Sequence, residues 1–170
     1  DKATGAVVAK TGSKKVTAYD DRDLSGKQRT STTHSVDVTG FPAQTTVDVI
    51  LISNGKQILT SGQPYKATTG PALPSGSTDL EPAYGTVKGS DSLSAGGALV
   101  YLTVEGGQTL STLANDSGNW IIPLSSLRTE DLTDYLPVTD RMTENIIVRY
   151  NSEELSAITD TLNDNPVPEM

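Results

Sequence analysis

The first half of the chain alternates apolar and polar residues in short runs that turn residues separate. Such alternation is typical of β-strands that bury one face. It predicts strands at residues 5–10, 15–19, 34–39, 46–52 and 64–69, and a turn at Asn54-Gly55. The first half is therefore expected to be a small β-domain.

The second half shows the same pattern around the only tryptophan of the chain. Asn115-Asp-Ser-Gly118 is a polar turn, and Trp120 follows it at the start of an apolar strand. We predict a tight hairpin here, with Trp120 buried between two sheets. Further strands are predicted at 83–88, 96–104, 108–113, 145–150 and 155–158, and a helical turn at 131–136. Six strands joined mostly by short turns predict a β-sandwich.

A proline-rich stretch separates the two halves. Residues 71–82 contain three prolines among small polar residues, which cannot sustain a ladder or a helix. The predicted fold class is all-β, with two immunoglobulin-like β-sandwich domains in tandem. The predicted boundaries are a first domain at 1–70, a linker at 71–82, a second domain at 83–165 and a tail at 166–170.

Residues 33–45, which read Thr-His-Ser-Val-Asp-Val-Thr-Gly-Phe-Pro-Ala-Gln-Thr, resemble the later part of a fibronectin type III domain, together with the strand that follows and residues 66–69. Phe41 stands at the leucine position of that family's corner motif, Thr45 at its threonine, and Val47 where its tyrosine is expected. The resemblance implies a sandwich with two further strands before Gly5. We expect an amino-terminal extension or another molecule to supply them by β-augmentation.

The second half is similar to the carboxypeptidase regulatory-like, or transthyretin-like, group of bacterial β-sandwiches. Gly85-Thr-Val87, Gly97-Ala-Leu-Val-Tyr-Leu102 and Gly118-Asn-Trp120 carry the similarity. These motifs imply a fold and no activity. The two domain types together resemble tandem surface modules of bacterial or archaeal extracellular proteins. The chain begins at Asp1, without a methionine, and we interpret it as a processed or excised piece.

The composition of the chain excludes several kinds of site and partner. The chain has no cysteine, which excludes disulfides and thiolate metal sites. Its net charge of −8 is divided unevenly, +2 over residues 1–79 and −10 over residues 80–170. The acidic half argues against nucleic acid, and no apolar run is long enough for a membrane helix. Opposite charges on the two halves favour head-to-tail self-association.

One cluster of carboxylates is a candidate cation site. Asp20, Asp21 and Asp23 crowd into one loop and could bind a hard cation such as Ca²⁺, which prefers oxygen ligands. The alternative is a solvated loop held by Arg22. His34 is the only histidine and has no neighbouring metal ligand in the sequence, so we assign it a structural or surface role.

Two modifications fit the sequence. Asn115-Asp-Ser117 is a glycosylation sequon in an exposed turn. An intramolecular isopeptide bond, known in related pilin sandwiches, would join Lys88 to Asn145 with Glu105 assisting, since all three lie on predicted strands.

Catalytic motifs are absent from the sequence. The carboxylate pairs Glu130-Asp131 and Glu153-Glu154 lie in polar contexts, and adjacent residues of a strand point to opposite faces. We therefore expect no enzyme activity and no cofactor. The predicted function is a structural protein of the cell surface, a filament, pilus or surface-layer subunit that self-associates into a polymer through strand complementation and charge. The alternative is a spacer or carbohydrate-binding accessory region of a larger secreted enzyme or adhesin, with glycans or other surface proteins as partners.

Overall fold

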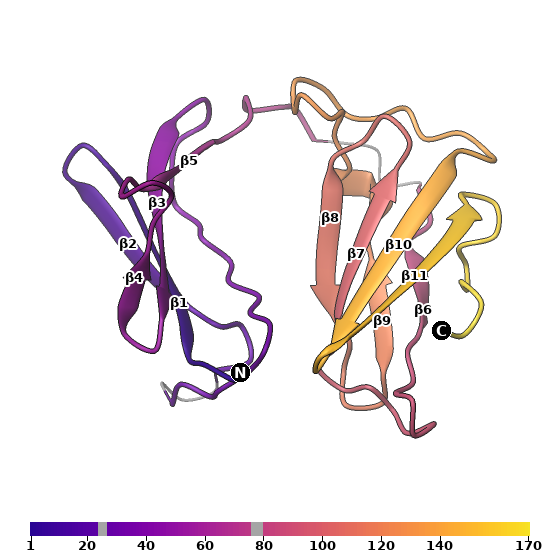
Figure 1. The fold of residues 1–170 in the computed structure, drawn as a ribbon. Coiled ribbons are helices and arrows are strands. Elements are labelled where there is room, and N and C mark those ends of the chain that lie inside the picture. The colour runs from indigo at the N-terminus through magenta and orange to yellow at the C-terminus, as the bar shows by residue number, and fades with distance from the viewer. Residues whose placement is uncertain (24–26, 76–79) are drawn as a thin grey trace. The chain divides into compact units, whose positions relative to one another are not determined.

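The computed structural model describes residues 1–23, 27–75 and 80–170, and it is built from β-strands and one short 3-10 helix (Figure 1). The all-β fold class is confirmed. The chain divides into two compact units, Asp1–Ala72 and Leu73–Met170. Part of the predicted proline-rich linker lies outside the described residues. No helix in the described ranges is long and apolar enough to cross a membrane.

The first unit forms one antiparallel sheet in the order β2-β1-β3-β4, and β5 pairs with β3 on the same side as β4. Its strands are β1 (Gly5–Thr11), β2 (Lys14–Tyr19), β3 (Thr46–Ser53), β4 (Lys56–Ile58) and β5 (Tyr65–Thr68). The strands predicted at 5–10, 15–19, 46–52 and 64–69 are therefore confirmed. Within the described part of this unit, no second sheet packs against the first.

The connection between β2 and β3 covers part of one face of this sheet. The ring of His34 packs on Gly5, where an added Cβ would lie 2.3 Å from it. The ammonium group of Lys14 lies 5.5 Å from the centre of the Phe41 ring and donates a hydrogen bond to the carbonyl of Gly40. An irregular segment thus stands where a sandwich has its second sheet.

Residues 34–39 were expected to form a strand, and this prediction is wrong. They belong to no ladder among the described residues. Asp21 binds this segment instead, because its carboxylate accepts from the Asp37 amide at 3.1 Å and from the Ser35 hydroxyl at 2.7 Å. These bonds, with one from the Asp21 amide to the Ser35 carbonyl at 2.8 Å, stand in place of a strand ladder.

The second unit is a β-sandwich of two antiparallel sheets. One sheet has the order β11-β10-β7-β8, and the other, seen behind it in Figure 1, pairs β6 with β9. The elements are β6 (Ala83–Thr86), β7 (Leu99–Val104), β8 (Thr109–Leu113), β9 (Asn119–Ile122), the 3-10 helix η2 (Leu124–Ser126), β10 (Thr143–Tyr150) and β11 (Glu153–Asp160). The strands predicted in this half are confirmed, with ends that differ by a few residues.

The core of the second unit lies between its sheets. Along β10 every second side chain is buried, and Ile146 and Val148 meet the inward residues of β7. Trp120 is 3% exposed and joins the same cluster, as predicted. The first unit buries far fewer apolar side chains, namely Ala6, Ala9, Val47 and Ile50. Since stability follows buried apolar area, most of the hydrophobic stabilisation belongs to the second unit.

The turn before Trp120 connects two sheets and does not form the predicted hairpin. Strand β8 pairs with β7, whereas β9 pairs with β6 in the opposite sheet. In that sheet Trp120 stands opposite Gly85, which leaves room for the indole, since an added Cβ would lie 3.1 Å from its nearest atoms. The helical turn predicted at 131–136 is also absent, since the bridge between Arg128 and Tyr135 forms a loop there.

The last residues of the chain run along β6. The carbonyl of Asp164 accepts from the Tyr84 amide at 3.0 Å, and the Val167 amide donates to the Tyr84 carbonyl at 2.8 Å. Met170 continues the pairing, with an amide that donates to Thr86 and a carbonyl that accepts from Lys88. Residues 166–170, which were expected to be a tail, thus hydrogen bond to β6 through their backbone, and we call residues 164–170 the terminal segment.

Candidate functional site

Strand β11 is the outer strand of its sheet, and its far side is open. All eight of its residues pair with β10, and no other strand in the described ranges pairs with it. Its side chains are exposed on both faces, Ile158 by 75% on the outer face and Leu155 by 45% on the inner face. An open edge of this length offers its free amide and carbonyl groups to another strand.

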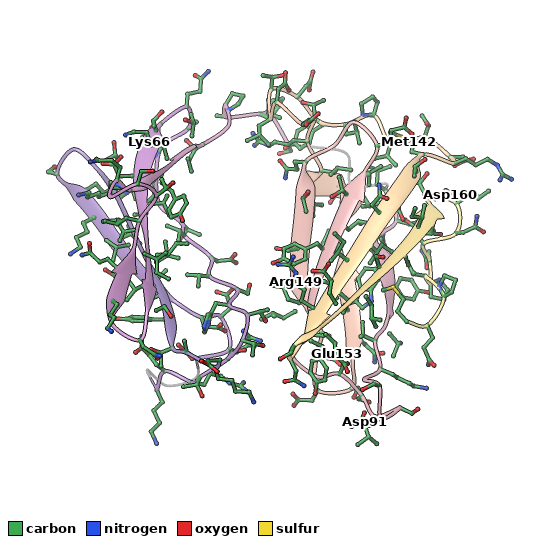
Figure 2. The ribbon with its side chains drawn as sticks, in the orientation of Figure 1. Lys66, Asp91, Met142, Arg149, Glu153 and Asp160 are labelled. Carbon is green, nitrogen blue, oxygen red and sulfur yellow. The ribbon has the colours of Figure 1, made fainter. Side chains whose placement is uncertain are left out.

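The open edge of β11 carries carboxylates at both ends. Glu153 and Glu154 begin the strand and Asp160 ends it, as Figure 2 shows for Glu153 and Asp160. The Glu154 carboxylate accepts from Arg149 Nε at 2.7 Å, in an exposed ion pair. Exposed pairs of this kind contribute little to stability, so Glu154 remains available to a partner.

The first unit has an open edge of opposite charge. Strand β2 pairs with β1, and no other strand within the described residues adjoins it. It begins with Lys14 and Lys15, both exposed, and ends with Tyr19, which is also largely exposed. Among the described residues, β2 is thus an outer strand that begins with two lysines, and β11 is one that begins with two glutamates.

The three carboxylates predicted as a cation site have separate hydrogen-bond partners. Asp20 is buried, and its two oxygens accept from Arg22 Nε and Nη2, both at 2.8 Å, and from His34 Nδ1 at 2.7 Å. Asp21 binds residues 35 and 37, and Asp23 accepts from the Arg29 amide. In the ranges that the structure describes, no three acidic or histidine side chains are grouped so that they could hold a metal ion.

Asp20 joins the end of β2 to the covering segment. Burial alone would raise the pKa of Asp20, but hydrogen bonds from Arg22 and His34, with the charge of Arg22, outweigh burial and hold that pKa well below its usual range. Because its pKa is lowered on folding, ionised Asp20 stabilises the folded state at any pH above the ordinary pKa of aspartate. This stability is lost as the pH falls from that value through the lowered pKa. Asp20 is thus a structural anchor of the first unit.

Asp20→Asn should destabilise the first unit by about 2 kcal/mol, because hydrogen bonds between charged groups are lost and Arg22 is left without its carboxylate. Hydrogen exchange of the β1 and β3 amides, followed by NMR, measures this loss without interference from the second unit. The control is Asp21→Asn at the neighbouring exposed residue, for which a loss below about 1 kcal/mol is expected. Equal effects of the two substitutions would show that Asp20 has no special role.

The second unit contains a buried pair of carboxyl groups. Glu144 projects from β10 into the sandwich and is fully buried, and neither of its side-chain oxygens accepts a hydrogen bond from a donor in the described chain. Its neighbour is the carboxyl group of Asp164, also buried, at the start of the terminal segment. Burial, then the charge of Asp164, raises the pKa of Glu144 to about 8, and burial also raises the pKa of Asp164.

The other predicted site residues lie apart from this pair. Asn115 is exposed, and its Oδ1 accepts from the amides of Ser117 and Asn119 at 2.9 and 3.1 Å, so glycosylation there stays a prediction. Lys88 pairs with Glu169 at 2.9 Å, whereas Asn145 faces out from the other sheet. The structure does not bring these two groups together for an isopeptide bond.

Sequence reasoning missed the pair of Glu144 and Asp164. One signal was present: Glu144 has the same strand parity as Ile146 and Val148, which alternation places inward. Nothing comparable marks Asp164, which follows the last strand. No family model, curated protein or solved structure matches the chain.

Proposed function

We propose that this protein is a non-enzymatic structural subunit of a cell-surface filament, pilus or surface layer, and that its copies join head to tail by pairing β2 of one copy with β11 of the next. The observation that supports this proposal is the presence of two open strand edges of opposite charge. The resemblance of the two halves to extracellular β-sandwich modules agrees with such a role.

The edges suit each other in backbone and in charge. An added strand gains a row of main-chain hydrogen bonds, and natural proteins rarely leave a long edge uncovered. In a parallel pairing, Lys14 and Lys15 meet Glu153 and Glu154, because each pair begins its strand. The contact uses two different surfaces, so it repeats without closing wherever its rotation does not form a ring.

A charge exchange tests the contact. In low salt, the double variant Lys14→Glu/Lys15→Glu should associate at least about tenfold more weakly than the parent, since like charges then face each other. Glu153→Lys/Glu154→Lys should have the same effect, and a mixture of the two variants should regain association. Sedimentation of the full chain at several salt concentrations is the measurement.

The matched control changes the same charge at two exposed lysines outside the strands, in Lys2→Glu/Lys27→Glu. A general charge effect would weaken this control equally and would contradict the proposed contact. A second readout uses the absence of native cysteine. Thr17→Cys in β2 and Ser156→Cys in β11, placed in separate copies, should form a disulfide-linked dimer on oxidation. Failure of both rescue and cross-linking would remove strand pairing as the mechanism.

A further inference from the structure

The terminal segment is attached to the second unit by its backbone and by several side chains, among them Glu169, which pairs with Lys88, and Asn165, which donates to Glu81. Its backbone pairs with β6, Val167 is buried in the core, and Asp164 meets Glu144 inside the sandwich. The segment also borders a hollow of about 530 Å³, where Pro166 and Val167 lie beside Trp120. Trp120 is therefore placed to report any movement of the segment.

The contact between Glu144 and Asp164 links the two sheets. Glu144 belongs to β10 of the larger sheet, and Asp164 hydrogen bonds through its carbonyl to β6 of the smaller one. Two carboxylates that are buried side by side repel each other, and the cost is high because little water screens them. One proton between them removes the repulsion and supplies the donor that the Glu144 oxygens otherwise lack.

The surroundings of the pair are acidic. Asp160 at the end of β11 and Glu81 before β6 act on the pair as further negative charges. Asp140, from the loop before β10, borders the same hollow of about 270 Å³ as Asp164. The charged groups that act on the pair from the end of β11 and from the residues before β6 are thus carboxylates, so ionisation of both members would leave adjacent negative charges without compensation.

We propose that the terminal segment is a detachable edge strand, which a proton shared by Glu144 and Asp164 holds on β6 and which loss of that proton releases. Release would uncover the backbone groups of Tyr84, Thr86 and Lys88, which the segment now occupies. The raised pKa of Glu144, about 8, places the transition in mildly alkaline solution. The device stands independently of the proposed filament function.

The test follows the terminal segment of the full chain between pH 6 and pH 9.5. Trp120 fluorescence should shift towards that of a hydrated indole with a midpoint near pH 8. At pH 9, the Val167 and Met170 amides should exchange about tenfold faster than in Glu144→Gln measured at the same pH, which removes the chemical effect of hydroxide. Glu144→Gln and Asp164→Asn should both lack the transition, since an amide donates without titrating.

The matched control is Glu105→Gln, an identical change at an exposed residue one position beyond the β7 partner of Glu144. It should keep the transition of the parent protein. A transition that persists in both Glu144→Gln and Asp164→Asn would overturn the proposal. Recovery of the low-pH fluorescence by calcium chloride at pH 9 would also overturn it, because a cation would then hold the two carboxylates together.

Discussion

Gly118→Ala should lower the free energy of unfolding of the second unit by about 4 kcal/mol, one of the largest effects expected of a single methyl group here. Gly118 has a φ of +78°, a conformation that costs other residues about 1–2 kcal/mol. Its added Cβ would also lie 2.3 Å from the carbonyl oxygen of Val87 and 3.3 Å from the amide nitrogen of Ala95. Both contacts are with backbone, so neither can be relieved by a side-chain rotation.

Gly106→Ala separates the two causes. Gly106 lies in the same unit and has a φ of +77°, but its added Cβ would meet only a Leu136 methyl group at 3.7 Å. It should show the conformational cost alone, about 1–2 kcal/mol. Urea unfolding monitored by Trp120 fluorescence gives both values. If the two variants lose equal stability, the close packing of Gly118 against Val87 has no energetic consequence.

The turn around Gly118 shows what local sequence can and cannot specify. Its polar residues predicted a turn and the apolar run after it predicted a strand with a buried Trp120, and both predictions are confirmed. The predicted hairpin was wrong, because the strand of Trp120 pairs with β6 in the other sheet and not with the strand before the turn. Which strands pair depends on residues far away in the sequence. Gly85, some 35 residues earlier, supplies the space that the indole requires.

The first unit shows the same limit in a different way. Alternation in residues 34–39 favoured a strand, but a strand needs a neighbour with free backbone groups. Asp21 and the end of β2 offer side-chain partners at close range, and the ring of His34 fits over Gly5. The alternation of apolar and polar residues is the same in an extended segment that binds side chains and in a strand that pairs with a neighbour. It could therefore not distinguish the two.

The acid pair was hidden for a third reason. Strand parity places Glu144 inward, but a buried carboxyl group is rare without a partner, and the partner lies about 20 residues later in an irregular segment. The two residues meet only because the terminal segment returns along β6. Tertiary arrangement, more than local pattern, creates this site.

The same pair should make the stability of the second unit depend strongly on pH. A carboxyl group whose pKa is raised on folding contributes its full stability below the unfolded pKa and loses it as the pH rises through the folded pKa. For Glu144 that window runs from 4.5 to about 8. Each unit of pKa corresponds to about 1.4 kcal/mol, so the parent protein should lose on the order of 3–5 kcal/mol between pH 5 and pH 8.5.

Glu144→Gln should remove most of this dependence, since glutamine remains neutral across the whole window. We expect the variant to exceed the parent protein in unfolding free energy at pH 8.5 by about 3 kcal/mol or more, and to approach it near pH 4.5. Urea unfolding at four pH values, again read from Trp120, provides the comparison, and Glu105→Gln should follow the parent curve. Parallel curves for parent and Glu144→Gln would mean that Glu144 is ionised in the folded protein and that a counter-charge, in place of a shared proton, balances it.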